Sequence, residues 1–265
     1  MKQRMKISFK KEKVNDNGSA LLTVLLFVAF LTILATTLLY VTGMNYIIKE
    51  ANYQNKKNFY TNETALEEIK ARLMADVVSE AGKEAFVQSS MMFSSAGETT
   101  DSGNIRTVGY NGYFTDAVCE IMYNEMTDLG VYDWDTYLSS KKTDTQATVK
   151  TKKTSVENTT NAAGRTVLAD ETSAYQTSGN GTFIVDRDHG VITIKNIEVT
   201  YINEHGLAGV ISTDLEIHAP EVDWSASKSE KAFLTEDTED GKDPKQKKTI
   251  DTAKCVRYTN WIKEN

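Results

Sequence analysis

The pattern of hydrophobic and polar residues changes twice along this chain, from a continuous apolar run to a helical period and then to strand-like alternation. Residues 17–48 carry no charged side chain, and their core, residues 20–41, is rich in Leu, Val, Ile and Phe. A helix needs about 20 such residues to cross about 30 Å of hydrocarbon. The sequence therefore predicts a membrane-spanning helix over residues 19–48.

Beyond this run, apolar residues recur at spacings of seven, three, four and four, which places them on one face of a helix. The residues of this seam are Phe59, Leu66, Ile69, Leu73 and Val77. We expect the helix to continue over residues 49–90. Gly82 is a candidate C-cap, and continuation of the helix through residues 84–92 is the alternative.

The end of the chain alternates as strands do. Residues 182–194 contain two β-branched runs around an Asp/Gly turn, and residues 197–217 repeat this form around a second turn. Residues 255–262 are predicted as a last edge strand. Successive hairpins make an antiparallel sheet with one apolar face, and the helical seam is the element available to cover it. The expected fold class is α+β.

The region between helix and sheet is the least regular. It is rich in Ser, Thr, Asn, Gly and Lys, with an apolar island at residues 117–138. The island predicts a short amphipathic helix followed by a turn. Residues 139–161 contain few apolar side chains and are predicted as a solvated loop or a mobile arm.

Basic residues precede the apolar run. They are Lys2, Arg4, Lys6, Lys10, Lys11 and Lys13. Against Glu12 and Asp16 they leave a net charge of about +4. Positively charged flanks remain cytoplasmic, so we expect a cytoplasmic N-terminus and a C-terminal domain on the outer side of the cell membrane.

Three interpretations of the apolar run remain open. A cleaved secretory signal has an apolar stretch of roughly 7 to 15 residues before a small-x-small site; here the stretch is longer, although residues 41–43 (Val-Thr-Gly) form a poor site. A plain uncleaved signal anchor explains the length and the flanking charge. The third interpretation adds Gly18, which stands between the basic leader and the first apolar residue.

The sequence Gly18-Ser-Ala-Leu-Leu resembles the start of PilX-type minor pilins, within the superfamily of type IV pilins and pseudopilins. These proteins follow the span with an aromatic-rich helical turn and an Ala-Glu pair, and residues 59–69 (Phe-Tyr-Thr-Asn-Glu-Thr-Ala-Leu-Glu-Glu-Ile) look similar. The resemblance covers about the first third of the chain. It implies cleavage by a prepilin peptidase after Gly18, which leaves Ser19 as the new N-terminus.

The resemblance also implies a pilin-like fold and a role in filament assembly. The implied parts are a basic leader (1–18), the transmembrane half of the helix (19–48), its exported half (49–90), an insertion with a short helix (91–180) and the sheet (181–265). Thr23, Phe59, Tyr60 and Glu63 are the implied assembly residues. The implied partners are other pilins or pseudopilins, the prepilin peptidase, an inner-membrane assembly platform and membrane lipid.

Thr23 departs from the pattern of the major pilins. It is the fifth residue after the predicted cleavage site, where most major pilins have a Glu that pairs with the amino terminus of a neighbouring subunit. A threonine supplies no such countercharge. This departure resembles the K-type minor pseudopilin of type II secretion and indicates a subunit of the filament tip or of the initiation complex.

Charge and cysteine content limit the other function classes. The formal net charge of the 265 residues is −7, and removal of the leader leaves about −11. Such an acidic domain has no electrostatic reason to bind nucleic acid. Cys119 and Cys255 are the right number for one disulfide in an exported domain; two buried free thiols are the alternative.

Catalytic and metal-binding motifs are missing from the sequence. It has no HExxH, GxSxG, GxGxxG or P-loop, and His189, His205 and His218 fall in predicted turns or at a strand end. Residues 186–190 and 236–241 are acidic but have no Glu to close an EF-hand loop, so they are interpreted as turns. We therefore expect no enzyme, cofactor or metal site. The alternative to a filament subunit is a single-pass anchored binding domain that does not polymerise.

Overall fold

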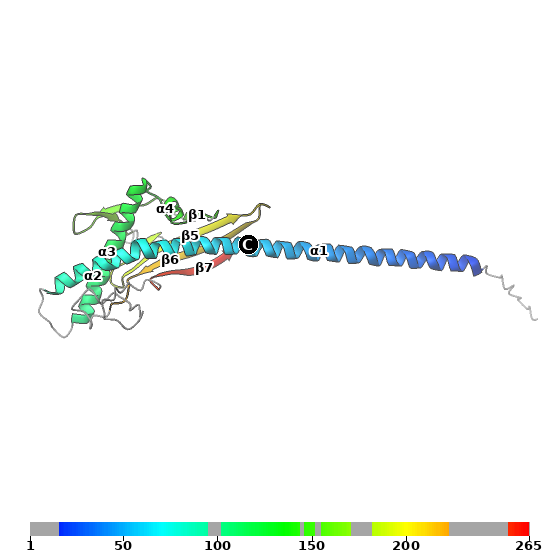
Figure 1. The fold of residues 1–265 in the computed structure, drawn as a ribbon, viewed down its shortest axis with the longest axis horizontal. Coiled ribbons are helices and arrows are strands. Elements are labelled where there is room, and N and C mark those ends of the chain that lie inside the picture. Colours follow the sequence, from blue (N-terminus) through cyan, green and yellow to red (C-terminus); the bar gives the residue numbers. More distant parts are fainter. Residues whose placement is uncertain are drawn as a thin grey trace, which may run out of the picture. The chain divides into compact units, whose positions relative to one another are not determined.

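The computed structural model describes residues 16–94, 102–143, 146–151, 155–170, 182–222 and 254–264. The chain divides into an N-terminal unit, Met1–Tyr53, and a C-terminal unit, Gln54–Asn265. Helix α1 (Asp16–Arg72) begins in the first and ends in the second, and Figure 1 shows it as the longest element. Residues 1–15, most of the predicted leader, lie outside the described residues.

The N-terminal unit contains the apolar part of α1. Within the described residues, the helix that includes this part is the one long and apolar enough to cross a membrane. Its threonines are compatible with an apolar surrounding because their hydroxyls donate to backbone carbonyls one turn earlier. Thr32 donates to the Val28 carbonyl at 2.8 Å, and Thr37 donates to the Ile33 carbonyl at 2.7 Å. The prediction of a helix with membrane-spanning length and composition is confirmed.

In the C-terminal unit the same helical course continues past α1. It runs through a π-helical turn, η1 (Leu73–Val78), into α2 (Ser79–Ser94). The wide π-turn leaves the adjacent residues Val77 and Val78 both buried. Gly82 lies inside α2, so it does not cap the helix, and the continuation through residues 84–92 is what the structure has.

Five strands form the main sheet: β1 (Thr148–Thr151), β4 (Phe183–Asp186), β5 (Val191–Ile202), β6 (Ala208–His218) and β7 (Val256–Glu264). The order is β1-β5-β6-β7, every pairing is antiparallel, and β4 pairs with the part of β5 that β1 leaves free. A separate hairpin joins β2 (Asn158–Thr160) to β3 (Thr166–Leu168). The predicted hairpins and the last edge strand are confirmed, and so is the α+β fold class.

Two β-bulges flank the middle of β6. The register shifts between Ile194 and Ile197 on β5 and between Thr259 and Ile262 on β7. Each bulge contains an asparagine with positive φ, Asn196 at 57° and Asn260 at 52°. Asp214 of β6 serves both bulges: its Oδ1 accepts from the Asn196 backbone N–H at 2.7 Å, and its Oδ2 accepts from Asn260 Nδ2 at 2.7 Å. The extra residue keeps Ile194 and Ile197 on the same face of the sheet.

The helical seam and one face of the sheet form a single hydrophobic core. Leu66, Ile69, Leu73 and Val77 are at most 1% exposed. The sheet contributes Ile192, Ile194, Ile197, Val199, Ile211, Leu215 and Ile217. Tyr258 on β7 donates its hydroxyl to the Leu66 carbonyl at 2.5 Å, which ties the edge strand to the helix. The predicted seam is confirmed as a buried face.

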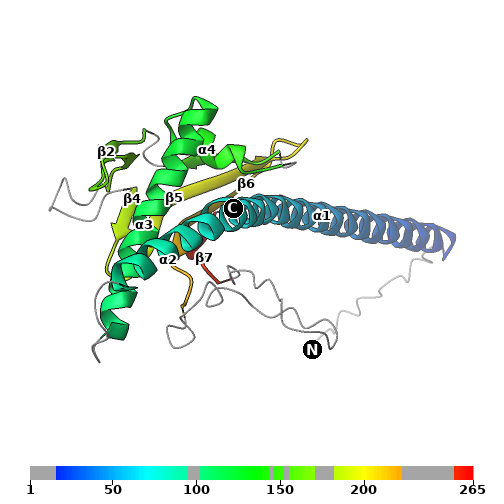
Figure 2. The ribbon, with the colours of Figure 1, turned by 60° about the vertical axis from the view of Figure 1, so that its left-hand side comes forward.

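The described residues between helix and sheet contain more regular secondary structure than predicted. The expected short helix is α3 (Ser102–Leu129), a helix of 28 residues, followed by α4 (Trp134–Ser140). Figure 2 shows α3 beside α2, against which it packs. The expected loop at residues 139–161 includes β1, which pairs with β5, and β2. Tertiary contacts override weak local propensity in both segments.

Candidate functional site

The candidate assembly surface in the N-terminal unit is the apolar part of α1. Its leucines between residues 21 and 39 are 43% to 73% exposed. Gly18 and Ser19 lie near the start of this helix, and Thr23 is exposed on it. A helix that is apolar on all sides requires a surrounding other than water, either lipid or other apolar helices.

The other predicted assembly residues lie on α1 in the C-terminal unit. Phe59 is half-buried, with its ring centroid 5.8 Å from that of Tyr60 and 6.4 Å from that of Trp261 on β7. Lys263 Nζ lies 4.9 Å from the Phe59 centroid, a cation–π distance. Tyr60 is 60% exposed, and Glu63 is half-buried. The structure thus brings Phe59 and Tyr60 to the end of β7.

Sequence reasoning missed Trp261 and Lys263 as neighbours of these aromatics. The edge strand predicted at residues 255–262 could have indicated this contact. A helix that covers a sheet can also contact the strand at the edge of that sheet. The register of β7 was the missing information. It depends on the bulge at Asn260, which no alternation of hydrophobic residues marks.

Two asparagines anchor α1 to the start of β6. Asn58 Nδ2 donates to the Leu207 carbonyl at 3.0 Å, and Asn62 Nδ2 donates to the Gly209 carbonyl at 2.7 Å. Both asparagines are fully buried. A Cβ on Gly209 would lie 2.8 Å from the Asn58 Cβ, so this close approach of strand and helix requires a glycine.

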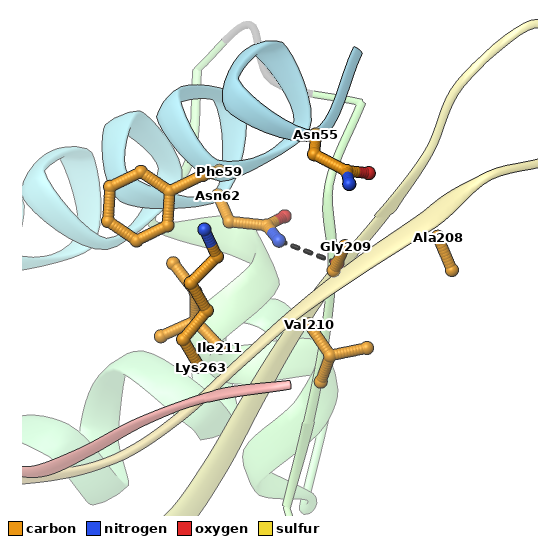
Figure 3. A pocket seen from close by; sticks show the side chains of 8 residues that line it. All are labelled: Asn55, Phe59, Asn62, Ala208, Gly209, Val210, Ile211 and Lys263. Carbon is orange, nitrogen blue, oxygen red and sulfur yellow. Dashed lines mark hydrogen bonds between the residues drawn. The ribbon is translucent and has the colours of Figure 1, made fainter. Parts of the chain in front are cut away.

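A small cavity adjoins this anchor, as Figure 3 shows. Its lining residues are Asn55, Phe59, Asn62, Ala208, Gly209, Val210, Ile211 and Lys263. Its volume of about 10 Å³ is close to that of one water probe. It therefore has no room for a substrate, and the arrangement serves to join helix and sheet.

A second, larger cleft of about 90 Å³ lies between α2, α3 and the β2–β3 hairpin. Arg165 of the hairpin pairs with Glu84 of α2 at 3.4 Å and with Glu120 of α3 at 2.8 Å. Asp116 also lines the cleft and pairs with Arg187 at 2.8 Å. Burial raises the pKa of Asp116, and the Arg187 charge opposes that shift. The Arg165 ion pairs hold the hairpin on the helices, and the Asp116–Arg187 pair joins α3 to the β4–β5 turn.

Lys141 forms a buried ionic contact elsewhere in the core. Its Nζ lies 2.8 Å from Glu125 Oε1 on α3 and 3.6 Å from Asp76 Oδ2 on η1. Tyr137 donates its hydroxyl to Glu125 Oε2 at 2.5 Å. Burial, and then the Glu125 carboxylate, raise the pKa of Tyr137. This cluster connects α4, α3 and η1, and its groups are already paired with one another.

The two cysteines are free thiols. Cys119 on α3 and Cys255 before β7 are both buried, so the predicted disulfide is absent and the alternative of two free thiols holds. Burial raises the pKa of the Cys119 thiol, and the nearby Asp116 adds to the shift. A buried thiol with a raised pKa is a poor nucleophile.

The histidines occupy the positions expected for turn residues. His189 lies in the β4–β5 turn, where its backbone N–H and ring Nδ1 contact the Asp186 carboxylate at 3.1 and 2.8 Å. His205 lies in the β5–β6 turn, and His218 ends β6, 3.0 Å from Glu216. Among the described residues no group of three or more His, Cys, Asp or Glu side chains is placed to hold a metal. Residues 236–241 lie outside the described residues.

Comparison of the chain with protein-family models, with curated proteins and with solved structures found no match. Function is therefore inferred from the sequence pattern and from the geometry of α1 and its surroundings.

Proposed function

We propose that the chain is a minor pilin or pseudopilin of PilX type, which assembles through α1 into a type IV pilus or a related secretion filament. The observation that carries the proposal is the contrast between the two parts of α1. Its first part is apolar and exposed, whereas its second part buries a seam against an antiparallel sheet. An element of this kind fits both a membrane and a bundle of like helices.

The processing site follows from the sequence around Gly18. Cleavage after Gly18 removes the basic leader and leaves Ser19 at the start of an intact apolar helix. The basic leader faces the cytoplasm and the C-terminal unit is exported. The partners are other pilins or pseudopilins, the prepilin peptidase and the inner-membrane assembly platform, and the protein is not an enzyme.

N-terminal sequencing of membrane fractions tests the proposal, in cells with and without a prepilin peptidase. We expect the mature chain to begin at Ser19 only when the peptidase is present. Gly18→Ala should slow processing because the peptidase then meets a side chain at the cleavage position. Gly43→Ala is the matched control: a Cβ at Gly43, in the same helix, would meet no other part of the chain within 4 Å, so this replacement should leave cleavage after Gly18 unchanged.

Two results contradict the proposal. An intact Met1 terminus in both strains indicates a plain anchored domain, which is the alternative function. A terminus at Met44 indicates an ordinary signal peptide cleaved after residues 41–43.

A further inference from the structure

One buried lysine lies between two carboxylates in the C-terminal unit. Lys141, the C-cap residue of α4, is only 7% exposed, and its Nζ donates a hydrogen bond to Glu125 Oε1 on α3 at 2.8 Å. The same Nζ lies 3.6 Å from Asp76 Oδ2 on η1. A lysine is rarely buried to this extent without a partner for its charge. Three helical segments therefore bring one amine and two carboxyl groups to a single point.

The two carboxylates are held differently. Both oxygens of Glu125 accept hydrogen bonds, Oε1 from Lys141 and Oε2 from the Tyr137 hydroxyl at 2.5 Å. The contact between Lys141 Nζ and Asp76 Oδ2 is longer than a hydrogen bond. It is close to the roughly 3 to 3.5 Å at which reacting atoms stand before a bond forms. Glu125 is thus placed to exchange a proton with Lys141, and Asp76 is placed to react with it.

We propose that Lys141 and Asp76 form an isopeptide bond, an amide between Lys141 Nζ and Asp76 Cγ, with Glu125 as the group that transfers protons. Glu125 takes one proton from the lysine ammonium and passes it to the Asp76 carboxylate. The lone pair of the resulting amine attacks Asp76 Cγ, and the N–C bond forms. Glu125 then moves a second proton from the nitrogen to the departing oxygen, the C–O bond breaks, and water leaves.

The ion pair itself contains every atom that this reaction requires. An ammonium and a carboxylate together carry three hydrogens and no net charge; the amide keeps one hydrogen, and the released water takes the other two. Nothing is oxidised or reduced, and Glu125 ends as the carboxylate that it was at the start. The reaction also removes a positive charge from a buried position, which relieves the desolvation cost of a buried ion pair.

The surroundings of Lys141 favour condensation over hydrolysis. The Tyr137 ring lies beside the lysine, with its centroid 5.2 Å from Nζ, and Leu138, one turn before Lys141, is fully buried. These side chains keep water away from the amine. Burial, and then the Glu125 carboxylate, raise the pKa of Tyr137, so its hydroxyl remains a donor to Glu125. The Asp76 side chain is 40% exposed, which leaves a route for the released water.

The bond ties η1 to the end of α4 and closes a covalent loop over residues 76–141. Such a cross-link restricts the unfolded chain, as a disulfide does, and the effect grows with the length of the loop. Cys119 and Cys255 supply no such link, because both are free thiols. The inference does not depend on filament assembly, since Asp76, Glu125 and Lys141 all lie in the C-terminal unit.

Peptide mass spectrometry tests the bond in the full-length chain, purified in detergent, reduced and denatured. Trypsin cleaves after lysine and arginine, so an unlinked chain yields the separate peptides 73–83 and 107–141. An amide on Lys141 blocks cleavage at that residue. We expect peptide 73–83 joined to peptide 107–142, at the sum of the two masses less one water, and loss of the free peptide 73–83.

Two variants separate the reaction from the fold. Glu125→Gln keeps both bond-forming residues but cannot take the lysine proton, so the free peptide 73–83 should return while circular dichroism shows the native helix content. Lys142→Arg is the matched control. Lys142 donates to the Ala147 carbonyl, and its replacement should leave the joined peptide intact.

Three results overturn the inference. Free peptides 73–83 and 107–141 from the native chain mean that Lys141 forms ion pairs only. Loss of water within peptide 107–142, with peptide 73–83 free, places the amide on Glu125 instead of Asp76. An undiminished amount of joined peptide in Glu125→Gln removes Glu125 from the reaction. The native chain alone decides whether the bond exists, even if Glu125→Gln does not fold.

Discussion

The two parts of α1 use similar side chains in opposite ways. In the N-terminal unit Leu34 and Leu39 are 43% and 73% exposed, whereas in the C-terminal unit Leu66 and Ile69 are each 1% exposed. The first part is apolar on all sides, and the second is apolar on one face. The periodicity of apolar residues therefore separates two kinds of helix. A helix that is apolar on all sides needs lipid or another chain to cover it, whereas a helix that is apolar on one face is covered by its own chain.

The polar side chains of the two parts also differ in where they find their hydrogen-bond partners. The threonine hydroxyls of the N-terminal unit donate to carbonyls of their own helix, as Thr36 does to Thr32 at 2.9 Å. Asn58 and Asn62, on α1 in the C-terminal unit, donate to carbonyls about 150 positions away along the chain, those of Leu207 and Gly209. These threonines of the first part need no partner element, which suits a membrane, whereas Asn58 and Asn62 of the second part need the folded sheet.

The largest expected effect comes from truncating one leucine in the buried helical seam, compared with one leucine in the apolar part of α1. Leu73→Ala should lower the free energy of unfolding of the C-terminal unit by about 2 to 5 kcal/mol, because it removes a fully buried side chain. Leu31→Ala, at a position 49% exposed, should leave that value unchanged. Urea unfolding of the full chain in detergent, followed by the fluorescence of its tryptophans, measures both. Equal effects would remove the distinction between the two parts.

A second prediction concerns Asp214, which holds both β-bulges. Asp214→Ala should cost about 1 to 3 kcal/mol, because the Asn196 N–H and the Asn260 amide lose their acceptor. Asp214→Asn retains one oxygen and should cost less. Glu198→Ala is the control: this exposed carboxylate lies on the same face of the sheet. If the Asp214 and Glu198 variants unfold at the same urea concentration, the carboxylate does not stabilise the bulges.

The seam and the hairpins could be predicted because their signal is local. Leu66, Ile69 and Leu73 recur with the helical period, and Asp/Gly turns separate the β-branched runs. The bulge at Asn196 breaks the strand alternation, so the single strand β5 looked like two shorter runs in the sequence. An asparagine tolerates positive φ, but its partner Asp214 lies on another strand and has no signal near it.

The helix α3 and the thiols could not be predicted for a different reason. The first half of α3 contains Gly103, Gly109 and Gly112 among asparagines and threonines, all of which have low helix propensity. Burial of Tyr110 and Phe114 against the rest of the core outweighs that propensity. Cysteine count alone does not decide between a disulfide and free thiols, because pairing depends on the distance between Cα atoms.

A smaller effect is expected at the contact between helix and sheet. Asn62→Ala should cost roughly 0.5 to 1.5 kcal/mol, because its amide no longer donates to the Gly209 carbonyl. Asn55→Ala is the matched control, since Asn55 is exposed and lines the same cavity in Figure 3. Thermal unfolding of the two variants compares them. An equal loss at Asn55 would mean that the buried amide adds nothing specific.

The smallest energetic change is expected at Thr23, and it tests what covers the N-terminal part. If neighbouring subunits do so, the absence of a carboxylate at the fifth mature position should keep the copy number low and favour the tip or the initiation complex. Quantitative mass spectrometry of sheared filaments should then find the chain far below the major pilin. Deleting the gene should reduce filament number more than filament length.

Thr23→Glu sharpens this test because it restores the countercharge for the amino terminus of a neighbour. In a filament subunit the substitution should increase the share of the chain found along the shaft. In a plain membrane anchor it can only make insertion harder, by about 2 to 3 kcal/mol for an acid at mid-span and by less this close to the interface. Thr42→Glu is the control, because it adds the same acid near the other end of the apolar run, where no amino terminus is expected. A rise in shaft content for Thr23→Glu alone supports paired assembly, and equal amounts for both variants contradict it.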